Sequence, residues 1–447
     1  MKMEELYDIY LSCGGRVTTD SRAVRGGELF FALRGENFDG NDYALKALEA
    51  GAAYAVVNDD VELVADARLI PVPDPFLALR DLAVWHRTHV RGGELPVIGL
   101  TGTNGKTTTK NLIAAVLARR FRVTATQGNL NNDIGVPLSL LSITPETQIA
   151  VIEMGANHPD DIAKLVRVSQ PDYGLITNVG RAHLLGFGSF EGVKAAKGEL
   201  YKWLGAHRGS LIFLNEDDPD LREMAAAQPC HVFGYGIQYQ GVEILPATPE
   251  EPFLRLRLGE DVIRTNLVGA YNATNVLAAI AVGDYFGVPR PDAIAAVEGF
   301  VPSNNRSQRT RTERNTLIVD AYNANPSSMR AALENFALVQ APHKLALLGD
   351  MRELGEESLA EHVKVLEQLQ AVGLDACLVG EEFQKALDVV SSRHPRPDRE
   401  SAPLPSFSWF PTSAALAEFL AAAPVRDAVI LIKGSRGIQM EKVIDKL

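Results

Sequence analysis

The segment Thr101–Thr109 contains the residue types that bind a polyphosphate. It reads Thr-Gly-Thr-Asn-Gly-Lys-Thr-Thr-Thr, and its glycines allow a tight turn whose backbone N–H groups point at one place. Lys106 would bring a positive charge to the β- and γ-phosphates, and Thr107 a hydroxyl group for Mg²⁺. The residues expected to contact the phosphates are Gly102, Thr103, Asn104, Gly105, Lys106, Thr107 and Thr108. The general pattern G-x-x-x-x-G-K-[ST] starts on a glycine where this chain has Leu100, so the match is to a shorter variant. The segment predicts nucleoside triphosphate binding.

The residues around this loop have the pattern that such a site needs. The apolar run Leu95–Leu100 reads as a short buried strand, and the apolar residues of 111–118 recur at helical spacing. A loop between a strand and a helix places the positive end of the helix at the phosphates. A chance glycine-rich turn is the alternative, and the position of Gly-Lys-Thr between strand and helix argues against it.

Composition indicates a multidomain globular chain and excludes several classes of function. The 447 residues are too many for one core, and 46% of them are hydrophobic with ordinary charge content. The net charge of −12 argues against nucleic-acid binding, which needs a basic face. The three cysteines lie far apart, without the spacing of a metal site or a disulfide framework. We find no signal peptide and no apolar run that could cross a bilayer, so we expect a cytoplasmic protein with no membrane insertion.

The order of the expected elements predicts an α/β protein of three domains. The first block, 1–83, is a small α/β unit that ends near a proline-rich linker at positions 71, 73 and 75. The second, 84–304, alternates strands with helices, which predicts a parallel sheet of the phosphate-loop ATPase type, with a hairpin over 253–267. The third, 305–447, alternates in the same way and predicts a doubly wound, Rossmann-like domain. A basic stretch at 306–314 falls where the last two blocks meet.

Polar residues of interest follow the carboxyl ends of the expected strands, where open α/β sheets bind ligands. They are Gly102–Thr107, Glu153, Asn178–His183, Asp320–Asn325, Gly349–Met351 and Lys433–Arg436. Because they come from two blocks, we expect two sheet edges that face each other across an interdomain cleft. Each residue also has an ordinary interpretation. Glu153 could cap a helix or be solvated at the end of its strand, and His183 could be a core or surface residue. Lys197 could be a solvated helix lysine, and the asparagines could form turns.

Taken together, these strings resemble the Mur ligase family of cell-wall amide-bond enzymes over essentially the whole chain. The family-wide strings are Thr-Gly-Thr-Asn-Gly-Lys-Thr-Thr, Glu153-Met-Gly, Thr177-Asn178 with His183-Leu184, Ala195-Ala196-Lys197 and Tyr271-Asn272-Ala-Thr-Asn275. The N-terminal Thr19-Asp20-Ser21-Arg22 resembles the UDP-binding domain of the members that add the third and fourth residues. The strings that resemble the member adding D-alanyl-D-alanine are 127–135, 320–326, 349–355 and 433–436. Asn41 and Ala321 depart from the histidine and serine usual at these places.

The resemblance implies an ATP-dependent ligase that joins D-alanyl-D-alanine to UDP-N-acetylmuramoyl-tripeptide through an acyl phosphate. The implied catalytic residues are Lys106, Glu153, His183, Lys197 and Arg306. Two Mg²⁺ ions are implied, one on Thr107 and Glu153 and one on His183 and a carbamate formed on Lys197 from CO₂. The further binding residues are Asn275, Arg306 and Asp320 for ATP, Ser21, Arg22, Asn131 and Asn132 for the UDP-substrate, and Asn323, Asn325, Lys433, Ser435 and Arg436 for D-alanyl-D-alanine or closure. Arg306 is preferred to Arg309 because the family's arginine precedes x-Gln, and we expect hinge motion over 304–316.

Three alternatives stay open at this point. The chain could be the diaminopimelate-adding ligase, but it lacks that enzyme's Asp-Asn-Pro-Arg string. It could resemble folylpolyglutamate synthase, against which the N-terminal UDP-type domain argues. It could be a nucleotide-dependent switch, although the Asn-Lys-x-Asp string of GTPases is absent from the sequence. Whether the third peptide residue is lysine or diaminopimelate is not encoded in any motif we can place, and we expect a monomer.

Overall fold

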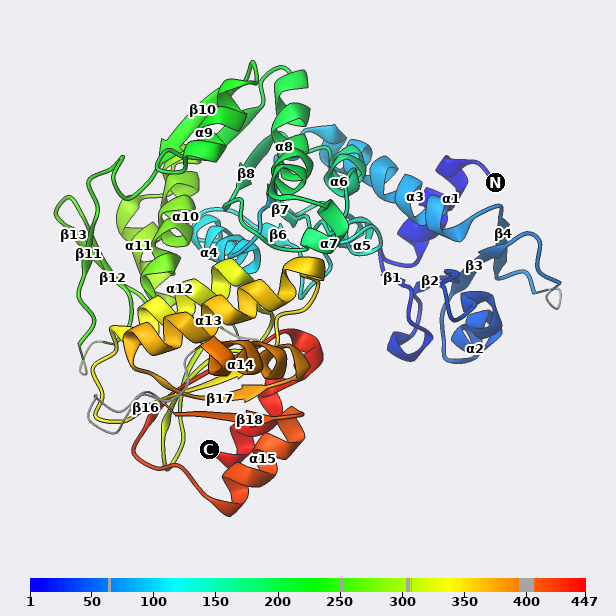
Figure 1. Cartoon of the computed structure of the whole chain (residues 1–447). Helices are drawn as coiled ribbons and strands as arrows, with labels where there is room; N and C mark the ends of the chain where they lie inside the picture. Colours follow the sequence, from blue (N-terminus) through cyan, green and yellow to red (C-terminus); the bar gives the residue numbers. More distant parts are fainter. Residues whose placement is uncertain (63–65, 249–251, 303–305, 307, 394–405) are drawn as a thin grey trace, which may run out of the picture.

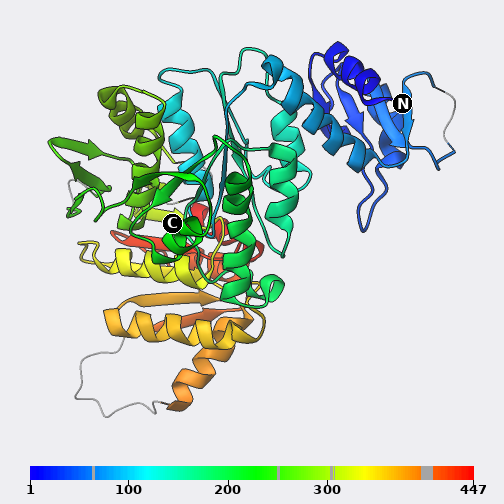
Figure 2. The ribbon, with the colours of Figure 1, turned by 90° about the horizontal axis from the view of Figure 1, so that it is seen from above.

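Three α/β domains follow one another along the chain in the computed structural model (Figure 1). The structure describes residues 1–62, 66–248, 252–302, 306, 308–393 and 406–447. The central and C-terminal domains pack against each other, whereas the N-terminal domain lies at one end of the molecule, as the view from above also shows (Figure 2). In the predicted division, the boundary between residues 304 and 305 lies outside the described residues.

The N-terminal domain is a four-stranded parallel sheet in the order β1-β2-β3-β4. Its elements are α1 (Met3–Ser12), β1 (Val17–Thr18), η1 (Ser21–Ala23), β2 (Leu29–Phe31), η2 (Gly40–Tyr43), α2 (Ala44–Glu49), β3 (Tyr54–Asn58), β4 (Leu69–Val72), α3 (Pro75–His89) and η3 (Val90–Gly93). The expected proline linker is in part a strand, because Pro71 lies in β4 opposite Val57. A proline is tolerated there because β4 is an edge strand and needs no N–H on its outer side.

Helix α3 joins the first two domains. Asp74 caps it by accepting hydrogen bonds from the backbone of Phe76 and Leu77, and Pro75 occupies its first turn, where no N–H donor is needed. Its apolar face contacts α1 on one side and two helices of the central domain on the other. The predicted boundary between residues 83 and 84 therefore falls inside a continuous helix, which belongs to both domains by its contacts.

The central domain is built on a six-stranded parallel sheet in the order β10-β9-β8-β5-β7-β6. Its elements are β5 (Val97–Thr101), α4 (Lys106–Leu117), β6 (Val123–Ala125), α5 (Gly135–Leu141), β7 (Ile149–Glu153), α6 (Asp161–Ser169), β8 (Tyr173–Ile176), α7 (Leu184–Phe187), α8 (Phe190–Ala206), β9 (Leu211–Asn215), α9 (Pro219–Ala226) and β10 (His231–Tyr235). Strands β5, β7 and β9 are buried along their whole length, as expected for a sheet covered on both faces.

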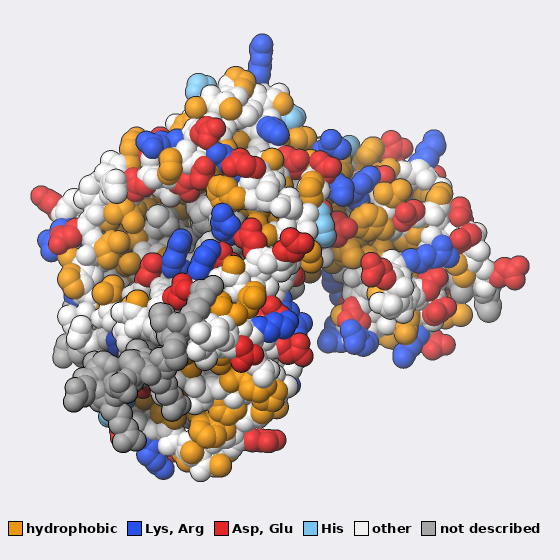
Figure 3. Space-filling view, in the orientation of Figure 1, with side chains coloured by type: hydrophobic (Ala, Val, Ile, Leu, Met, Phe, Trp, Pro, Cys, Tyr) orange, Lys and Arg blue, Asp and Glu red, His pale blue; other side chains and the backbone are white. Residues whose placement is uncertain are grey.

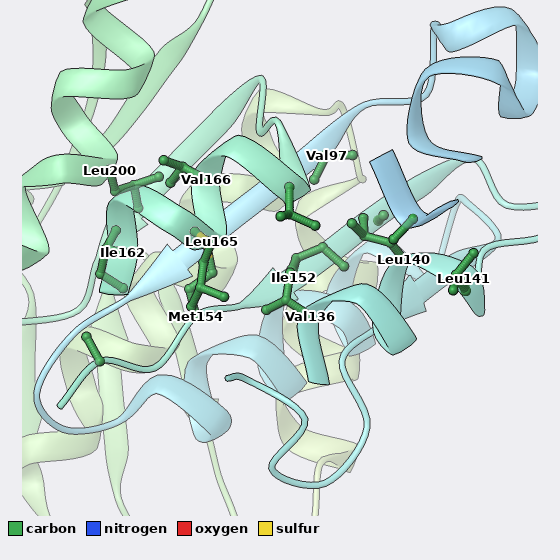
Figure 4. Packing of buried hydrophobic residues seen from close by; sticks show 14 of the residues in the cluster. Val97, Val136, Leu140, Leu141, Ile152, Met154, Ile162, Leu165, Val166 and Leu200 are labelled. Atoms are coloured by element: carbon green, nitrogen blue, oxygen red, sulfur yellow. The ribbon is translucent and has the colours of Figure 1, made fainter. Parts of the chain in front are cut away.

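One face of this sheet packs on helices α5, α6 and α8. Figure 4 shows Val97 and Ile152 of the sheet against Val136 and Leu140 of α5 and Leu165 of α6. The other face is covered by α4, α10 (Ala273–Tyr285) and α11 (Arg290–Gly299). The strand order reverses around β5, so the loop that follows β5 lies where such sheets bind ligands.

A small antiparallel sheet, β11-β12-β13, extends this domain. Its strands are β11 (Glu243–Leu245), β12 (Arg255–Leu258) and β13 (Asp261–Arg264), and the turn η4 (Ala270–Asn272) follows. The predicted hairpin over 253–267 is confirmed by the pairing of β12 with β13.

The C-terminal domain has a six-stranded sheet in the order β14-β15-β19-β16-β17-β18, parallel except for β14. Its elements are β14 (Gln308–Arg311), β15 (Thr316–Asp320), α12 (Pro326–Ala337), β16 (Lys344–Gly349), η5 (Gly355–Glu357), α13 (Ser358–Val372), β17 (Asp375–Val379), α14 (Glu381–Arg393), β18 (Phe407–Phe410), α15 (Ser413–Ala422), β19 (Val429–Lys433), η6 (Arg436–Ile438) and η7 (Met440–Lys446). The basic stretch at 306–314, where the last two predicted blocks meet, contains strand β14. Among the described residues, no helix is long and apolar enough to cross a membrane.

Candidate active site

The phosphate-binding loop joins β5 to α4, as the sequence predicts. Gly102 has φ +149° and Gly105 has φ +78°, which are conformations that favour glycine. Space requires glycine as well, because a Cβ atom at Gly105 would lie 2.7 Å from Oδ1 of Asn275, and one at Gly102 would collide with Oγ1 of Thr177. The backbone of the loop can therefore approach a ligand at the N-terminus of α4.

Neighbouring side chains hold this loop in place. The backbone N–H of Asn104 donates to Oδ1 of Asn178 at 3.0 Å, and Oγ1 of Thr177 donates to the Asn104 carbonyl at 2.6 Å. The ammonium group of Lys106 donates to the carbonyls of Gly102 at 2.7 Å and Thr103 at 3.2 Å. Burial, with a further contribution from the Arg306 charge, lowers the pKa of Lys106. A phosphate would offer this ammonium a better partner than backbone carbonyls.

Glu153, at the end of β7, is the carboxylate of the site and is 1% exposed. Its Oε1 accepts hydrogen bonds from Oγ1 of Thr107 at 3.1 Å and from Nδ2 of Asn131 at 2.8 Å. Its Oε2 is a buried oxygen without a hydrogen-bond partner. A buried acceptor without a partner lowers the stability of the fold unless a cation or a hydrogen-bond donor binds to it. The pair of a hydroxyl and a carboxylate oxygen fits Mg²⁺, which binds one or two carboxylates together with phosphate oxygens and water. No cluster of three or more His, Cys, Asp or Glu suited to a metal occurs in the described ranges.

Lys110 is a member of the site that the sequence analysis missed. It lies one helical turn after Lys106 on α4, its side chain is 3% exposed, and its Nζ is 3.9 Å from Oε2 of Glu153. The same ammonium donates to the carbonyl of Thr126. Burial lowers the pKa of Lys110, and the Glu153 charge opposes this effect. The sequence contains a signal, since Lys110 shares its helix face with the buried Ile113 and Leu117, where a lysine needs a partner.

His183 and Lys197 lie near the loop but in different surroundings. His183 has φ +53°, and its Nδ1 contacts Oε2 of Glu353 in the C-terminal domain. Burial lowers the pKa of His183, opposed by Glu353. Lys197, on α8, is 2% exposed with its Nζ 5.8 Å from the ring centre of Phe187. Burial and then the Lys106 charge lower the pKa of Lys197 to about 7. Lys197 does not line the cavity described next, unlike His183.

A cavity of about 650 Å³ opens between the central and C-terminal domains. It is lined by the predicted residues Thr103, Asn104, Gly105, Lys106, Thr108, Asn131, Asn132, Glu153, His183, Asn275, Arg306, Asp320, Asn323, Asn325 and Lys433. Arg306 lies here with its guanidinium 3.5 Å from the ring centre of Tyr322, whereas Arg309 is exposed on β14, 5.6 Å from Phe253. In the structure, therefore, Arg306 lines the cavity and Arg309 does not.

The C-terminal wall of this cavity is built from strand ends. Asp320 and Lys433 are paired across β15 and β19, and Nζ of Lys433 donates to Oδ2 of Asp320 at 2.5 Å. Asn325 caps α12 and donates from Nδ2 to Oδ1 of Asn104 at 2.8 Å, which joins the two domains directly at the phosphate loop. Asn275 is held by Thr109, which donates to its Oδ1 at 3.0 Å.

A second, smaller cavity of about 190 Å³ adjoins the first. It shares His183, Asn323 and Asn325 with the first cavity and adds Ala182, Ala324, Arg352, Glu353, Ser435, Arg436 and Gly437. Of the residues predicted for D-alanyl-D-alanine, Asn323, Asn325, Ser435 and Arg436 line this cavity, while Lys433 lines the larger one.

Two of the predicted UDP-substrate residues lie apart from the rest. Ser21 and Arg22 are in η1 of the N-terminal domain, where Arg22 is exposed and pairs with Asp20 at 2.9 Å. Neither lines the two cavities. Figure 3 shows an open gap between the N-terminal domain and the C-terminal domain. Asn131, predicted for the same substrate, instead contacts Glu153 beside the phosphate loop.

The fold and this site define a class: phosphate-loop enzymes that complete a nucleotide cavity with residues of a second α/β domain. Three family models match the chain, namely "Mur ligase family, catalytic domain" over residues 16–85, "Mur ligase middle domain" over 100–283 and "Mur ligase, glutamate ligase domain" over 305–436. The chain belongs to the Mur ligase family.

Individual relatives agree with this assignment over nearly the whole chain. The UDP-N-acetylmuramoyl-tripeptide--D-alanyl-D-alanine ligase of Escherichia coli is 34% identical, with 96% of this chain and 93% of the relative covered. The enzyme of the same name from Haemophilus influenzae is 33% identical, with 97% and 93% covered. A crystal structure of MurF from Acinetobacter baumannii superposes with a TM-score of 0.82 at 30% identity, covering 97% of this chain and 93% of that one. MurF ligase from Thermotoga maritima in complex with ADP gives 0.79 at 26% identity, with 96% of each chain covered.

Proposed function

We propose that this chain is an ATP-dependent ligase that joins D-alanyl-D-alanine to UDP-N-acetylmuramoyl-tripeptide and forms the pentapeptide precursor of peptidoglycan. The main support for the proposal is the match, over nearly the full length, to relatives named for this activity. In addition, the phosphate loop lines a cavity between two domains. The strings that resemble the D-alanyl-D-alanine-adding member, 127–135, 320–326, 349–355 and 433–436, all contribute to the cavity walls.

The reaction needs activation because a carboxylate and an ammonium form a salt, not an amide, at neutral pH. Transfer of the γ-phosphoryl group of ATP to the tripeptide carboxylate gives an acyl phosphate, and the amine of the dipeptide then displaces phosphate. Phosphoryl transfer mainly requires positioning and neutralisation of spread negative charge. Lys106 and Arg306 line one cavity together with loop residues 103–105, so the ammonium and guanidinium groups can do both. Thr107 and Glu153 would hold Mg²⁺, which supplies positive charge to the β- and γ-phosphates when bound.

The surroundings of Lys197 support the carbamate implied by the family resemblance. Carbamylation requires a neutral amine, which attacks CO₂ and releases one proton. Burial brings the pKa of Lys197 to about 7, so a substantial fraction of this amine is neutral at neutral pH. An ordinary exposed lysine is protonated in all but a very small fraction at this pH. His183 and the carbamate of Lys197 would together hold the second Mg²⁺.

The proposed places of the substrates follow the division into three domains, 1–83, 84–304 and 305–447. The N-terminal domain would hold the UDP group at Ser21 and Arg22, with Asn131 and Asn132 at its inner end. Asn275 would lie on the adenine side and Asp320 at the ribose, which requires Asp320 to exchange its contact with Lys433 for a sugar hydroxyl. Asn323, Asn325, Ser435 and Arg436 would contact D-alanyl-D-alanine, and Lys433 would act in closure.

The test is release of ADP and phosphate by the purified protein. We expect release only when ATP, Mg²⁺, UDP-N-acetylmuramoyl-tripeptide and D-alanyl-D-alanine are all present. Omission of the dipeptide should leave an acyl phosphate that hydroxylamine traps as a hydroxamate. Slow hydrolysis that is indifferent to both substrates would instead favour a nucleotide switch. Tripeptides ending in lysine and in diaminopimelate, compared in the same assay, identify the natural third residue.

We also propose a cytoplasmic monomer. The support for the compartment is chemical, since the proposed reaction consumes ATP and water-soluble nucleotide and peptide substrates. The two cavities are built wholly from one chain, so a second copy is not required for the site. Light scattering coupled to size exclusion measures the mass directly.

A further inference from the structure

Helix α3 carries two adjacent buried polar residues that the reaction described so far does not use. His86 is 3% exposed and Arg87 is 5% exposed, and both lie in the last turn of the helix. Side chains of these types are seldom buried to this extent unless other groups bind them. The groups that bind them here belong mainly to the central domain.

Arg87 binds the C-terminal end of α6. Its Nε donates to the carbonyl of Ser169 at 3.3 Å, and its Nη2 donates to the carbonyl of Gln170 at 3.1 Å. The last carbonyls of a helix lack partners within the helix and form the negative end of its dipole, so a guanidinium group suits this place. Nη2 also donates to Oδ2 of Asp172 at 3.0 Å, and the same oxygen accepts from the backbone N–H of Val97 at 2.9 Å. Arg87 is thereby linked to β5, the strand that leads to the phosphate loop.

His86 binds the chain at the end of α5. Its Nε2 donates to the carbonyl of Ile143 at 2.9 Å, because a carbonyl oxygen can only accept, and its Nδ1 then accepts from the hydroxyl of Tyr7 at 3.1 Å. Burial lowers the pKa of His86, which favours this neutral form. Tyr10 donates to the carbonyl of Leu141 at 2.8 Å. Since both tyrosines lie on α1, these bonds join the N-terminal domain to α5 of the central domain.

The two helices that are held in this way begin at the larger cavity. Asn131 and Asn132 line the cavity shortly before α5, and Asp161 lines it at the start of α6. Ser21 and Arg22, which we propose for the UDP group, lie in the domain whose last strand is followed by α3. The UDP-substrate has a limited reach, so the orientation of α3 decides whether its two ends can be bound at the same time.

We propose that His86 and Arg87 are positioning residues, which hold α3 against α5 and α6 at the angle that lets one UDP-substrate reach both η1 and the phosphate loop. The proposal rests on the proposed function. The two domains also share an apolar core, which includes Leu6, Leu82 and Ile152. Apolar contacts are non-directional, whereas the buried hydrogen bonds of His86 and Arg87 fix an angle. Their loss leaves both parts of the substrate site intact but makes the separation between them variable.

The test compares the complete UDP-substrate with UDP, which can occupy only the N-terminal part of the site. Each is titrated calorimetrically into the full-length protein loaded with a non-hydrolysable ATP analogue and Mg²⁺, and the ratio of the two affinities gives the gain from binding both ends. When only a fraction of the molecules has the competent arrangement, the apparent affinity falls by that fraction. We expect Arg87→Met to reduce the gain about tenfold and to change the affinity for UDP by less than about twofold. In turnover, KM for the UDP-substrate should rise while KM for ATP stays the same.

Two further variants keep the test valid if Arg87→Met does not fold. Arg87→Lys keeps the charge but loses the planar fork, so it should restore part of the gain. His86→Leu removes the bond to Ile143 and should reduce the gain in the same direction as Arg87→Met.

Arg80→Met is the matched control. Arg80 lies on the same helix, but its side chain is 41% exposed and pairs with the neighbouring Asp81 at 3.8 Å. The control should leave both affinities unchanged. If Arg87→Met weakens UDP and the UDP-substrate equally, or leaves their ratio unchanged, the proposal is wrong.

A second measurement separates this proposal from the proposed function. If the unaltered protein fails to bind the UDP-substrate, the proposed function is contradicted. Small-angle scattering of the protein without substrates then still tests the role of Arg87. The maximum dimension should increase in Arg87→Met and stay the same in Arg80→Met, and equal scattering from the two variants would overturn the positioning role.

Discussion

Removal of Lys110 should destabilise the central domain because it leaves the Glu153 charge buried without its nearest cation. The two side chains are 3% and 1% exposed, and Nζ lies 3.9 Å from Oε2. Breaking a buried ion pair from one side costs about 3–5 kcal/mol of unfolding free energy. A methionine in place of Lys110 keeps most of the apolar stem, so the loss reports the charge. For a domain of about 200 residues, 1 kcal/mol lowers Tm by about 2–4 °C, which gives a fall of roughly 6–20 °C.

The assay is thermal unfolding followed by the fluorescence of Trp203, which lies in α8 of the central domain. A background with Trp85→Phe and Trp409→Phe leaves this single probe, so that unfolding of the other domains does not contribute. Lys164→Met is the matched control, since Lys164 also lines the larger cavity but is exposed. It should change the unfolding free energy by no more than about 0.5 kcal/mol.

A double-mutant cycle decides whether the loss comes from the ion pair. Glu153→Gln removes the charge that Lys110 balances, so the variant carrying both substitutions should be much less destabilised than the sum of the single variants. Single losses that add within about 0.5 kcal/mol would refute the coupling of Lys110 to Glu153. A second readout is the gain in Tm on adding Mg²⁺ and ADP, which should be larger in Lys110→Met, since the bound ion replaces the missing charge beside Glu153.

Four further outcomes are expected. Lys197→Ala should abolish ligation and recover part of it in the presence of small carboxylic acids, whereas a variant that never responds to them would contradict the carbamate. Because burial lowers the folded-state pKa of Lys197 to about 7, its protonation opposes folding at every pH below the unfolded-state pKa of about 10.4. In CO₂-free buffer Lys197→Met should therefore be stabilising at about pH 6 and should lose this advantage progressively between about pH 7 and about pH 10.4, as measured by urea unfolding. Arg306→Ala should reduce kcat by about a hundredfold or more, while Arg309→Ala should leave it nearly unchanged. Small-angle scattering with ATP analogue and UDP-substrate should show a radius of gyration that falls toward the roughly 22 Å of a compact chain of this length, and an unchanged radius would contradict the expected closure.

The parts of the site that the sequence predicted are those set by local order along the chain. The loop from Gly102 to Thr107 follows a strand and begins a helix, so its position needs no knowledge of distant residues. Glu153 and Asp320 were placed correctly at the edge of a sheet because parallel strands bring their carboxyl ends together. The choice of Arg306 over Arg309 came from the family pattern, and in the structure Arg306 lines the cavity beside Tyr322 whereas Arg309 is exposed on β14.

The parts that were missed depend on contacts between residues far apart in the sequence. Lys110 looks like an ordinary helix lysine until the fold places Glu153 beside it. The contact between His183 and Glu353 joins positions 170 residues apart in two domains, which no local pattern encodes. The prolines near residue 71 indicate a break in regular structure, but an edge strand tolerates proline, so the linker was predicted where part of β4 lies. Similarly, the arginines of 308–311 gave no apolar signal for β14, whose side chains are partly exposed.

The interface between the central and C-terminal domains explains how such a site can both bind and release its substrates. The contacts that join the phosphate loop side to the C-terminal domain are polar: Asn104 with Asn325, His183 with Glu353 and Arg181 with Glu357. About half of the Arg181 and Glu357 side chains is exposed, and such pairs contribute about 1 kcal/mol or less in water. These polar contacts therefore contribute little to closure, whereas Val268 and Phe253 of the central domain also pack into the apolar core of the C-terminal domain. We expect charged substrates that bridge Lys106, Arg306 and Asp320 to add to the free energy of closure.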